Sequence, residues 1–135
     1  MVLLIDANIL LDVLMNREDF VQDSSTIWKL CETKQAIGYV STLTFANLVY
    51  IMRKELSHDQ IELVYKQLNL IFEIVDFDTN ILEQAIQMKW NDFEDAIQSA
   101  TAQKVKADFI ITRNVKDFIE SKIPSLTPTE LISRL

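Results

Sequence analysis

The protein has 135 residues and a mass of 15.6 kDa, which predicts one domain over residues 1–135, and its 49% apolar content and mean hydropathy of +0.10 exclude a disordered tail. One glycine and two prolines exclude hairpin-rich barrels and glycine-rich phosphate loops, while one cysteine and one histidine exclude zinc fingers and disulfide scaffolds. The net charge of −7 opposes passive binding to nucleic acid.

Short apolar runs alternate along the chain with longer stretches of helical spacing, a pattern typical of an α/β fold with a parallel sheet. Strands are expected, in chain order, at residues 2–5, 37–41, 70–75, 108–112 and 123–127. Helices are expected where apolar residues recur at i, i+3, i+4 and i+7, over residues 21–31, 45–56, 61–68, 81–86 and 93–100, with a last short helix after Thr127 or Thr129.

The apolar N-terminal segment contains Asp6 and Asp12 and has no basic flank. It is therefore expected to be neither a signal peptide nor a membrane span. A cytoplasmic location is expected, which also suits the single thiol of Cys31.

Polar residues gather at the ends of the predicted strands, where ligands bind in open parallel sheets. The residues that follow the first, second and fourth strands are, in turn, Asp6 and Asn8; Ser41, Thr42, Thr44 and Asn47; and Thr112, Arg113, Asn114 and Asp117. Asp92 and Asp95 open the helix before the fourth strand and share one helical face. If the sheet is wound in this order, Asp6, Asp95 and Asp117 converge, and the sequence predicts an acidic cleft.

These residues also have purely structural interpretations. Asn8 suits the N-cap of a helix over ILLDVL, and Asp6 suits an Asx turn at the strand end. Asp92 and Asp95 resemble a capping box with Asp in place of Glu. Arg113 is by default a solvated surface charge. Both kinds of interpretation remain open from the residues alone.

Three blocks together resemble a PIN domain, the PilT N-terminus family: DANILLD at 6–12, STLTFANLVYIMRK at 41–54 and DFEDAIQSATAQKVKADFIITRNVKDF at 92–118. The resemblance covers nearly the whole chain, and the third block is its most specific part. It implies a three-layer α/β/α sandwich around a central parallel sheet of about five strands. It also implies a metal-dependent endoribonuclease of the kind found in VapC-like toxins.

The resemblance also implies a set of site residues. Carried over by position, it places catalytic acids at Asp6, Asp95 and Asp117, which would also bind the metal, a further acid at Asp92, and polar supports at Asn8, Thr112 and Asn114. One position departs from the family pattern. Where a pattern like SxLTxAEL has Glu, this chain reads STLTFANL and has Asn47.

The implied cofactor is Mg²⁺ or Mn²⁺, because hard cations take carboxylate oxygens, waters and substrate phosphate as ligands. The cation would stabilise charge at the scissile phosphate and turn its bound water into a nucleophile. Arg113 and Lys116 are the nearest candidates for holding the RNA backbone. The leading hypothesis is a toxin of a toxin–antitoxin pair that cleaves single-stranded RNA.

Two other hypotheses come from different classes of protein. Asn47 and the net charge of −7 motivate a catalytically weakened PIN fold that binds RNA or protein. A receiver-like phosphoacceptor domain also places Asp at strand ends, but the run FIITRNVKDF fits PIN spacing better. The partners implied by the leading hypothesis are an RNA substrate, a protein antitoxin that covers the acidic cleft and a second copy of the chain in a homodimer, with no membrane.

Overall fold

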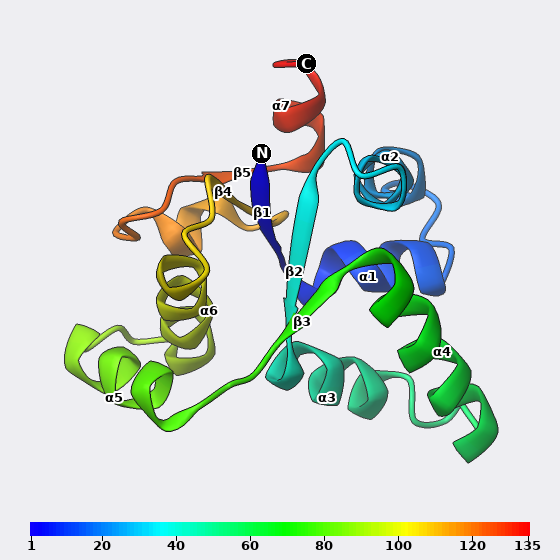
Figure 1. The fold of residues 1–135 in the computed structure, drawn as a ribbon, viewed down its shortest axis with the longest axis horizontal. Helices are drawn as coiled ribbons and strands as arrows, with labels where there is room; N and C mark the ends of the chain where they lie inside the picture. Colours follow the sequence, from blue (N-terminus) through cyan, green and yellow to red (C-terminus); the bar gives the residue numbers. More distant parts are fainter.

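Five parallel strands form one sheet in the order β3-β2-β1-β4-β5 in the computed structural model, which describes all residues from 1 to 135 (Figure 1). The strands are β1 (Val2–Ile5), β2 (Ile37–Ser41), β3 (Glu73–Val75), β4 (Phe109–Ile111) and β5 (Ser125–Leu126). Leu4 of the central strand β1 is aligned with Tyr39 on one side and Ile110 on the other. The end of β1 therefore lies in the middle of the carboxyl edge of the sheet.

Helices cover both faces of this sheet (Figure 1). They are α1 (Ala7–Leu14), α2 (Val21–Glu32), α3 (Thr42–Ile51), α4 (His58–Ile71), α5 (Thr79–Met88), α6 (Phe93–Lys104), the 3-10 helix η1 (Val115–Phe118) and α7 (Pro128–Ile132). The helices α1 to α4 and α7 pack on one face, and α5, α6 and η1 pack on the other. The predicted three-layer α/β/α sandwich is thus confirmed. None of the helices is both long and apolar enough to cross a bilayer.

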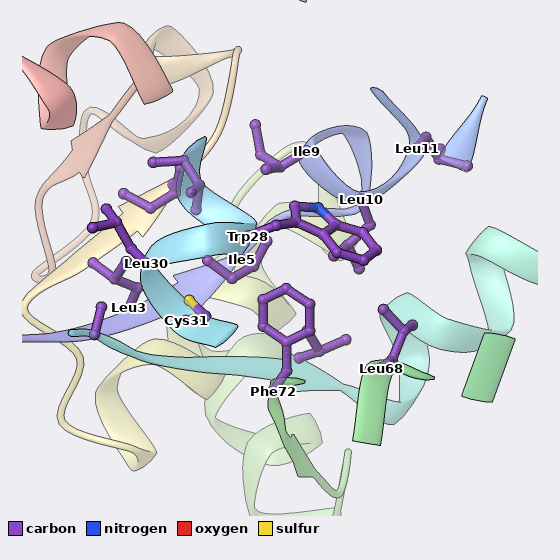
Figure 2. Close-up of a cluster of buried hydrophobic side chains, with 14 of the residues drawn as sticks. Leu3, Ile5, Ile9, Leu10, Leu11, Trp28, Leu30, Cys31, Leu68 and Phe72 are labelled. Atoms are coloured by element: carbon purple, nitrogen blue, oxygen red, sulfur yellow. The ribbon is translucent and has the colours of Figure 1, made fainter. Parts of the chain in front are cut away.

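Alternating side chains of β1 build a core on each face. Leu3 and Ile5 are buried in the larger cluster under α1 to α4, whereas Leu4 is buried in a smaller cluster under α6 and η1. In the larger cluster, the rings of Trp28 and Phe72 meet edge to face with centroids 5.3 Å apart (Figure 2). Both cores hold β1 rigidly, which fixes the position of the residue that follows it.

The only glycine serves close packing rather than a turn. A Cβ at Gly38 would lie 2.7 Å from the Cys31 sulfur and 2.8 Å from the Phe72 ring. Helix ends that usually use glycine in a left-handed conformation here use Asn16, Lys34, Lys89 and Lys106, all at positive φ. Lysine thus takes the left-handed position after three helices, where glycine is the usual residue.

The structure corrects the predicted element boundaries in two places. The strand expected at 70–75 is wrong over its first residues, since α4 continues to Ile71 and β3 begins only at Glu73. The helix expected over 45–56 ends at Ile51, although Met52 and Leu56 still pack against the larger core. Apolar spacing is compatible with more than one backbone conformation, and in 70–75 the run includes Leu70, whose side chain is exposed.

Candidate active site

Asp6 lies directly after β1 and caps α1. Its Oδ1 accepts a hydrogen bond from the Ala7 N–H at 2.9 Å and one from Gln98 Nε2 at 3.5 Å, while its Oδ2 accepts one from the Thr112 hydroxyl at 2.8 Å. The N-cap of α1 is therefore Asp6 and not Asn8, which lies in the first turn. Thr112 is fully buried after β4, so two neighbouring strands fix this carboxylate.

A pocket of about 370 Å³ opens in front of Asp6. Its polar lining residues are Asp6, Asn8, Asn47, Asp92, Glu94, Asp95, Asn114 and Asp117. No basic residue lines it. The structure thus brings the sequence-predicted acids and most of their predicted polar supports to one pocket, with Thr112 behind it.

Asp95 is the acid most affected by this crowding. Burial, followed by the neighbouring charges of Asp92, Asp6 and Asp117, raises its pKa to about 7. Asp92 is the N-cap of α6, since its Oδ1 accepts a hydrogen bond from the Asp95 N–H at 3.1 Å. Asp92 therefore caps α6 without the reciprocal bond of a capping box, and it also lines the acidic pocket.

The pKa of Asp6 is raised as well. Burial raises its pKa, and this effect exceeds the lowering by hydrogen bonds from Thr112, Ala7 and Gln98 and by the charge of Arg113. Two carboxyl groups in one pocket thus hold protons more tightly than free aspartate does. Such a pocket favours a bound cation, which removes the repulsion between them.

The two predicted RNA-contacting residues lie in different surroundings. Arg113 does not line the acidic pocket: its guanidinium pairs with Asp12 at 3.3 Å and stacks over the Phe20 ring at 4.0 Å. Lys116 lines an adjoining depression of about 430 Å³ together with Lys89 and Trp90. Three acids, Asp92, Asp95 and Asp117, line both hollows. Lys116 and Lys89 are therefore the basic groups beside the acids.

Sequence analysis did not single out Glu94, Gln98 or Lys89. Glu94 and Gln98 belong to the same helix as Asp95, one turn apart, and they line a small pocket with Asp6 and Asn47. Their position in the block DFEDAIQ, beside two recognised acids, was the available signal. Lys89 follows α5 at a φ of 58°, a conformation for which a lysine gives no sequence signal.

One geometric expectation is not met. No group of three or more acid, histidine or cysteine side chains in the structure could together hold a metal ion. Asp6, Asp95 and Asp117 therefore do not form one metal-sized cluster. Hydrogen bonds from Thr112 and Ala7 fix the Asp6 carboxylate at the end of β1.

Comparison with known proteins agrees with the fold. A family model described as "PIN domain" matches residues 2–116. The chain is similar to a toxin–antitoxin complex from Klebsiella pneumoniae, with 26% identity, a TM-score of 0.69 and coverage of 93% of this chain and 96% of that chain. No curated protein matches the sequence.

Two further solved structures share the fold at lower identity. One is VapBC2 from Rickettsia felis bound to a DNA fragment from their promoter, with 17% identity, a TM-score of 0.72 and coverage of 94% and 98% of the two chains. The other is VapC20 from Mycobacterium tuberculosis, a sarcin–ricin loop cleaving toxin, with 12% identity, a TM-score of 0.64 and coverage of 80% and 86%.

Proposed function

The chain belongs to the PIN domain family, and on that premise we propose that it is a metal-dependent endoribonuclease, the toxin of a toxin–antitoxin pair. The observation that carries the proposal is the pocket at the end of β1, which gathers five carboxyl side chains and no basic one. Similarity to a toxin–antitoxin complex at 26% identity over nearly the full length supports it.

The donor set of this pocket fits Mg²⁺ or Mn²⁺. Its oxygen ligands are hard, and a cation would neutralise the charges of Asp92, Asp6 and Asp117, which add to burial in raising the pKa of Asp95. Mg²⁺ commonly uses only one or two protein carboxylates and fills its other positions with water and phosphate oxygens. When bound, such a cation would neutralise charge developing at the scissile phosphate and supply an activated water.

Residues of the pocket would bind the cation, orient its ligands and hold the substrate. Asp6 and Asp95 would hold the cation, because both line the acidic pocket and the charge of Asp6 acts on Asp95. Thr112 would orient Asp6 through their 2.8 Å hydrogen bond. Asp117 and Asn114, which line the same pocket, would hold water or the phosphate.

Lys116 and Lys89 would bind the RNA backbone in the adjoining depression. Neither lysine forms an ion pair within the chain, so both are available to phosphate. Trp90 lines the same hollow and offers an aromatic surface to a base. Because the two lysines and Trp90 lie beside Asp95 and Asp117, RNA bound to them would cross the acidic pocket.

A protein antitoxin is the partner that this proposal requires. Tyr50 and Ile51 line the acidic pocket and are 65% and 46% exposed, so the rim offers apolar surface for a protein to cover. The chain would also form a homodimer, a state that the PIN resemblance implies. Co-expression with the neighbouring reading frame, followed by size determination of the complex, tests both partners.

A second candidate is a PIN fold that binds RNA or protein without cleaving it. The specific observation in its favour is Asn47, which lines the pocket where the family pattern has an acid. An amide oxygen still coordinates a cation but brings no formal charge. The two candidates differ in whether the purified protein breaks phosphodiester bonds.

The test is incubation of the purified protein with 5′-labelled single-stranded RNA in Mg²⁺, in Mn²⁺ and in EDTA. The proposal predicts discrete internal cleavage with either metal and none in EDTA. Binding of the RNA without cleavage under all three conditions would favour the second candidate. Cleavage that persists in EDTA would contradict metal dependence.

A further inference from the structure

A small pocket between α3 and α6 adjoins the acidic pocket and shares lining residues with it. Its volume is about 60 Å³, and its polar lining comprises Asp6, Thr44, Asn47, Glu94, Asp95 and Gln98. Glu94 and Gln98 lie four residues apart on α6 and therefore on one face of the helix. Asn47 approaches them from α3, with its Nδ2 3.5 Å from Glu94 Oε2.

Gln98 carries an unpartnered oxygen in this pocket. The residue is only 6% exposed, and its Oε1 has no hydrogen-bond partner. Its Nε2 donates to Asp6 Oδ1 at 3.5 Å, and this contact fixes the orientation of the amide, because the reverse would set the oxygen against a carboxylate. A buried acceptor without a partner is costly, so it points to a donor or a cation bound beside it.

The pocket places a carboxylate where the sequence lacks one. Asn47 stands on α3 where the family pattern has a charged Glu. Glu94 of α6 contacts the Asn47 side chain. Glu94 is exposed whereas Gln98 is buried, so the two line the pocket from its mouth to its inner end. A volume of about 60 Å³ accommodates an ion together with water.

We propose that Glu94 and the Oε1 of Gln98 bind a divalent cation in this pocket, and that α6 thereby replaces the acid missing from α3. The inference rests on the proposed function and assigns a metal-binding role to two residues to which the resemblance gave no role. A mixed set of carboxylate and amide oxygens also agrees with the finding that no three acids could hold an ion together.

The test uses Mn²⁺ alone as the probe, with binding followed by calorimetry and by thermal melting, so that no cleavage is required. The variants are Glu94→Gln, which keeps the shape and removes the charge, and Gln98→Met, which keeps the volume and removes the oxygen. Glu83→Gln on the exposed face of α5 is the matched control. Asp95→Asn tests a carboxylate that the small pocket and the acidic pocket share.

Glu94→Gln should weaken Mn²⁺ binding at least about tenfold. Gln98→Met should bind less tightly and lose part of the rise in melting temperature that Mn²⁺ produces, whereas Glu83→Gln should match the unmodified protein. If Asp95→Asn abolishes Mn²⁺ binding while Glu94→Gln and Gln98→Met leave it unchanged, the inference is overturned and the proposed function stands. If the unmodified protein neither binds Mn²⁺ nor cleaves RNA, both fail together.

Discussion

The Asp12 carboxylate and the Arg113 guanidinium form an ion pair, 3.3 Å between Oδ1 and Nη2, in which the Asp12 side chain is fully buried. Ser24 donates to the other carboxylate oxygen at 2.9 Å, and Arg17 is a third partner at 3.5 Å from Oδ1. Because Arg113 stands between Thr112 and Asn114, the pair joins α1 to the segment that carries two residues of the site. The pair therefore anchors the loop after β4.

Arg113→Met should lower the free energy of unfolding by about 2 kcal/mol, because it leaves a buried carboxylate with weaker partners. Arg53→Met is the matched control, since Arg53 also stacks on an aromatic ring, Tyr50 at 4.2 Å, but is exposed. The control should change stability by less than about 0.5 kcal/mol. Urea denaturation of both variants checks this, and equal losses would show that the buried pair has no special role.

The acidic pocket should make the metal-free protein less stable as pH rises. The pKa of Asp95 is about 7 in the folded protein, against an ordinary value of 3.8, so the folded state binds the additional proton between these values. The resulting stabilisation is fully present below pH 3.8 and is lost as pH rises through about 7. Denaturation in EDTA at pH 5 and pH 8 measures the change.

Asp95→Asn serves as the control for this pH effect. It removes the titrating group and should reduce the difference in stability between the two pH values. An undiminished difference in that variant would assign the effect to another group.

Asn47→Glu should tighten Mg²⁺ binding and lower stability in EDTA. The new carboxylate would add negative charge to the pocket, and without metal it would lie close to Glu94, which the Asn47 amide now contacts at 3.5 Å. Asn47→Gln adds length without charge and should do neither. Calorimetric titration with Mg²⁺ and melting curves in EDTA provide both measurements, and identical affinities in the three proteins would remove Asn47 from the metal site.

Lys89→Gln and Lys116→Gln should each raise KM for single-stranded RNA about threefold and leave kcat nearly unchanged, because each lysine contributes an exposed phosphate contact. Lys106→Gln is a matched control, since Lys106 also follows a helix at positive φ, 55° against 58° for Lys89, but lines neither hollow. Kinetics at two salt concentrations test this, and a rise in KM for Lys106→Gln equal to the others would indicate a general charge effect.

Local patterns predicted much of the fold. The runs at 2–5 and 37–41 match β1 and β2, and β1 reads as a continuous apolar segment because a central strand in a parallel sheet is buried on both faces. The run at 70–75 misled, since Leu70, 79% exposed, and Ile71 belong to the end of α4. Nothing local distinguishes an apolar helix end from the strand that follows it.

Only the site residues that lie in a family motif could be predicted from the sequence. The family blocks pointed to Asp6, Asp95 and Asp117, and the strand order β2-β1-β4 explains why they line one pocket. Two relationships depend on contacts between distant segments. Arg113 pairs with Asp12, 101 residues earlier, and Glu94 meets Asn47 across two helices, so neither contact leaves a trace in local spacing.

The most direct test of the account is RNA cleavage by Asp6→Asn beside the unmodified protein, in Mg²⁺ and in Mn²⁺. Asparagine retains the oxygen that caps α1 and removes a charge whose burial raises the pKa of Asp6, so the variant should melt at the same temperature or higher. Cleavage of single-stranded RNA should disappear in the variant and persist in the unmodified protein. Equal cleavage by the two folded proteins would contradict the assignment of the catalytic site to the end of β1.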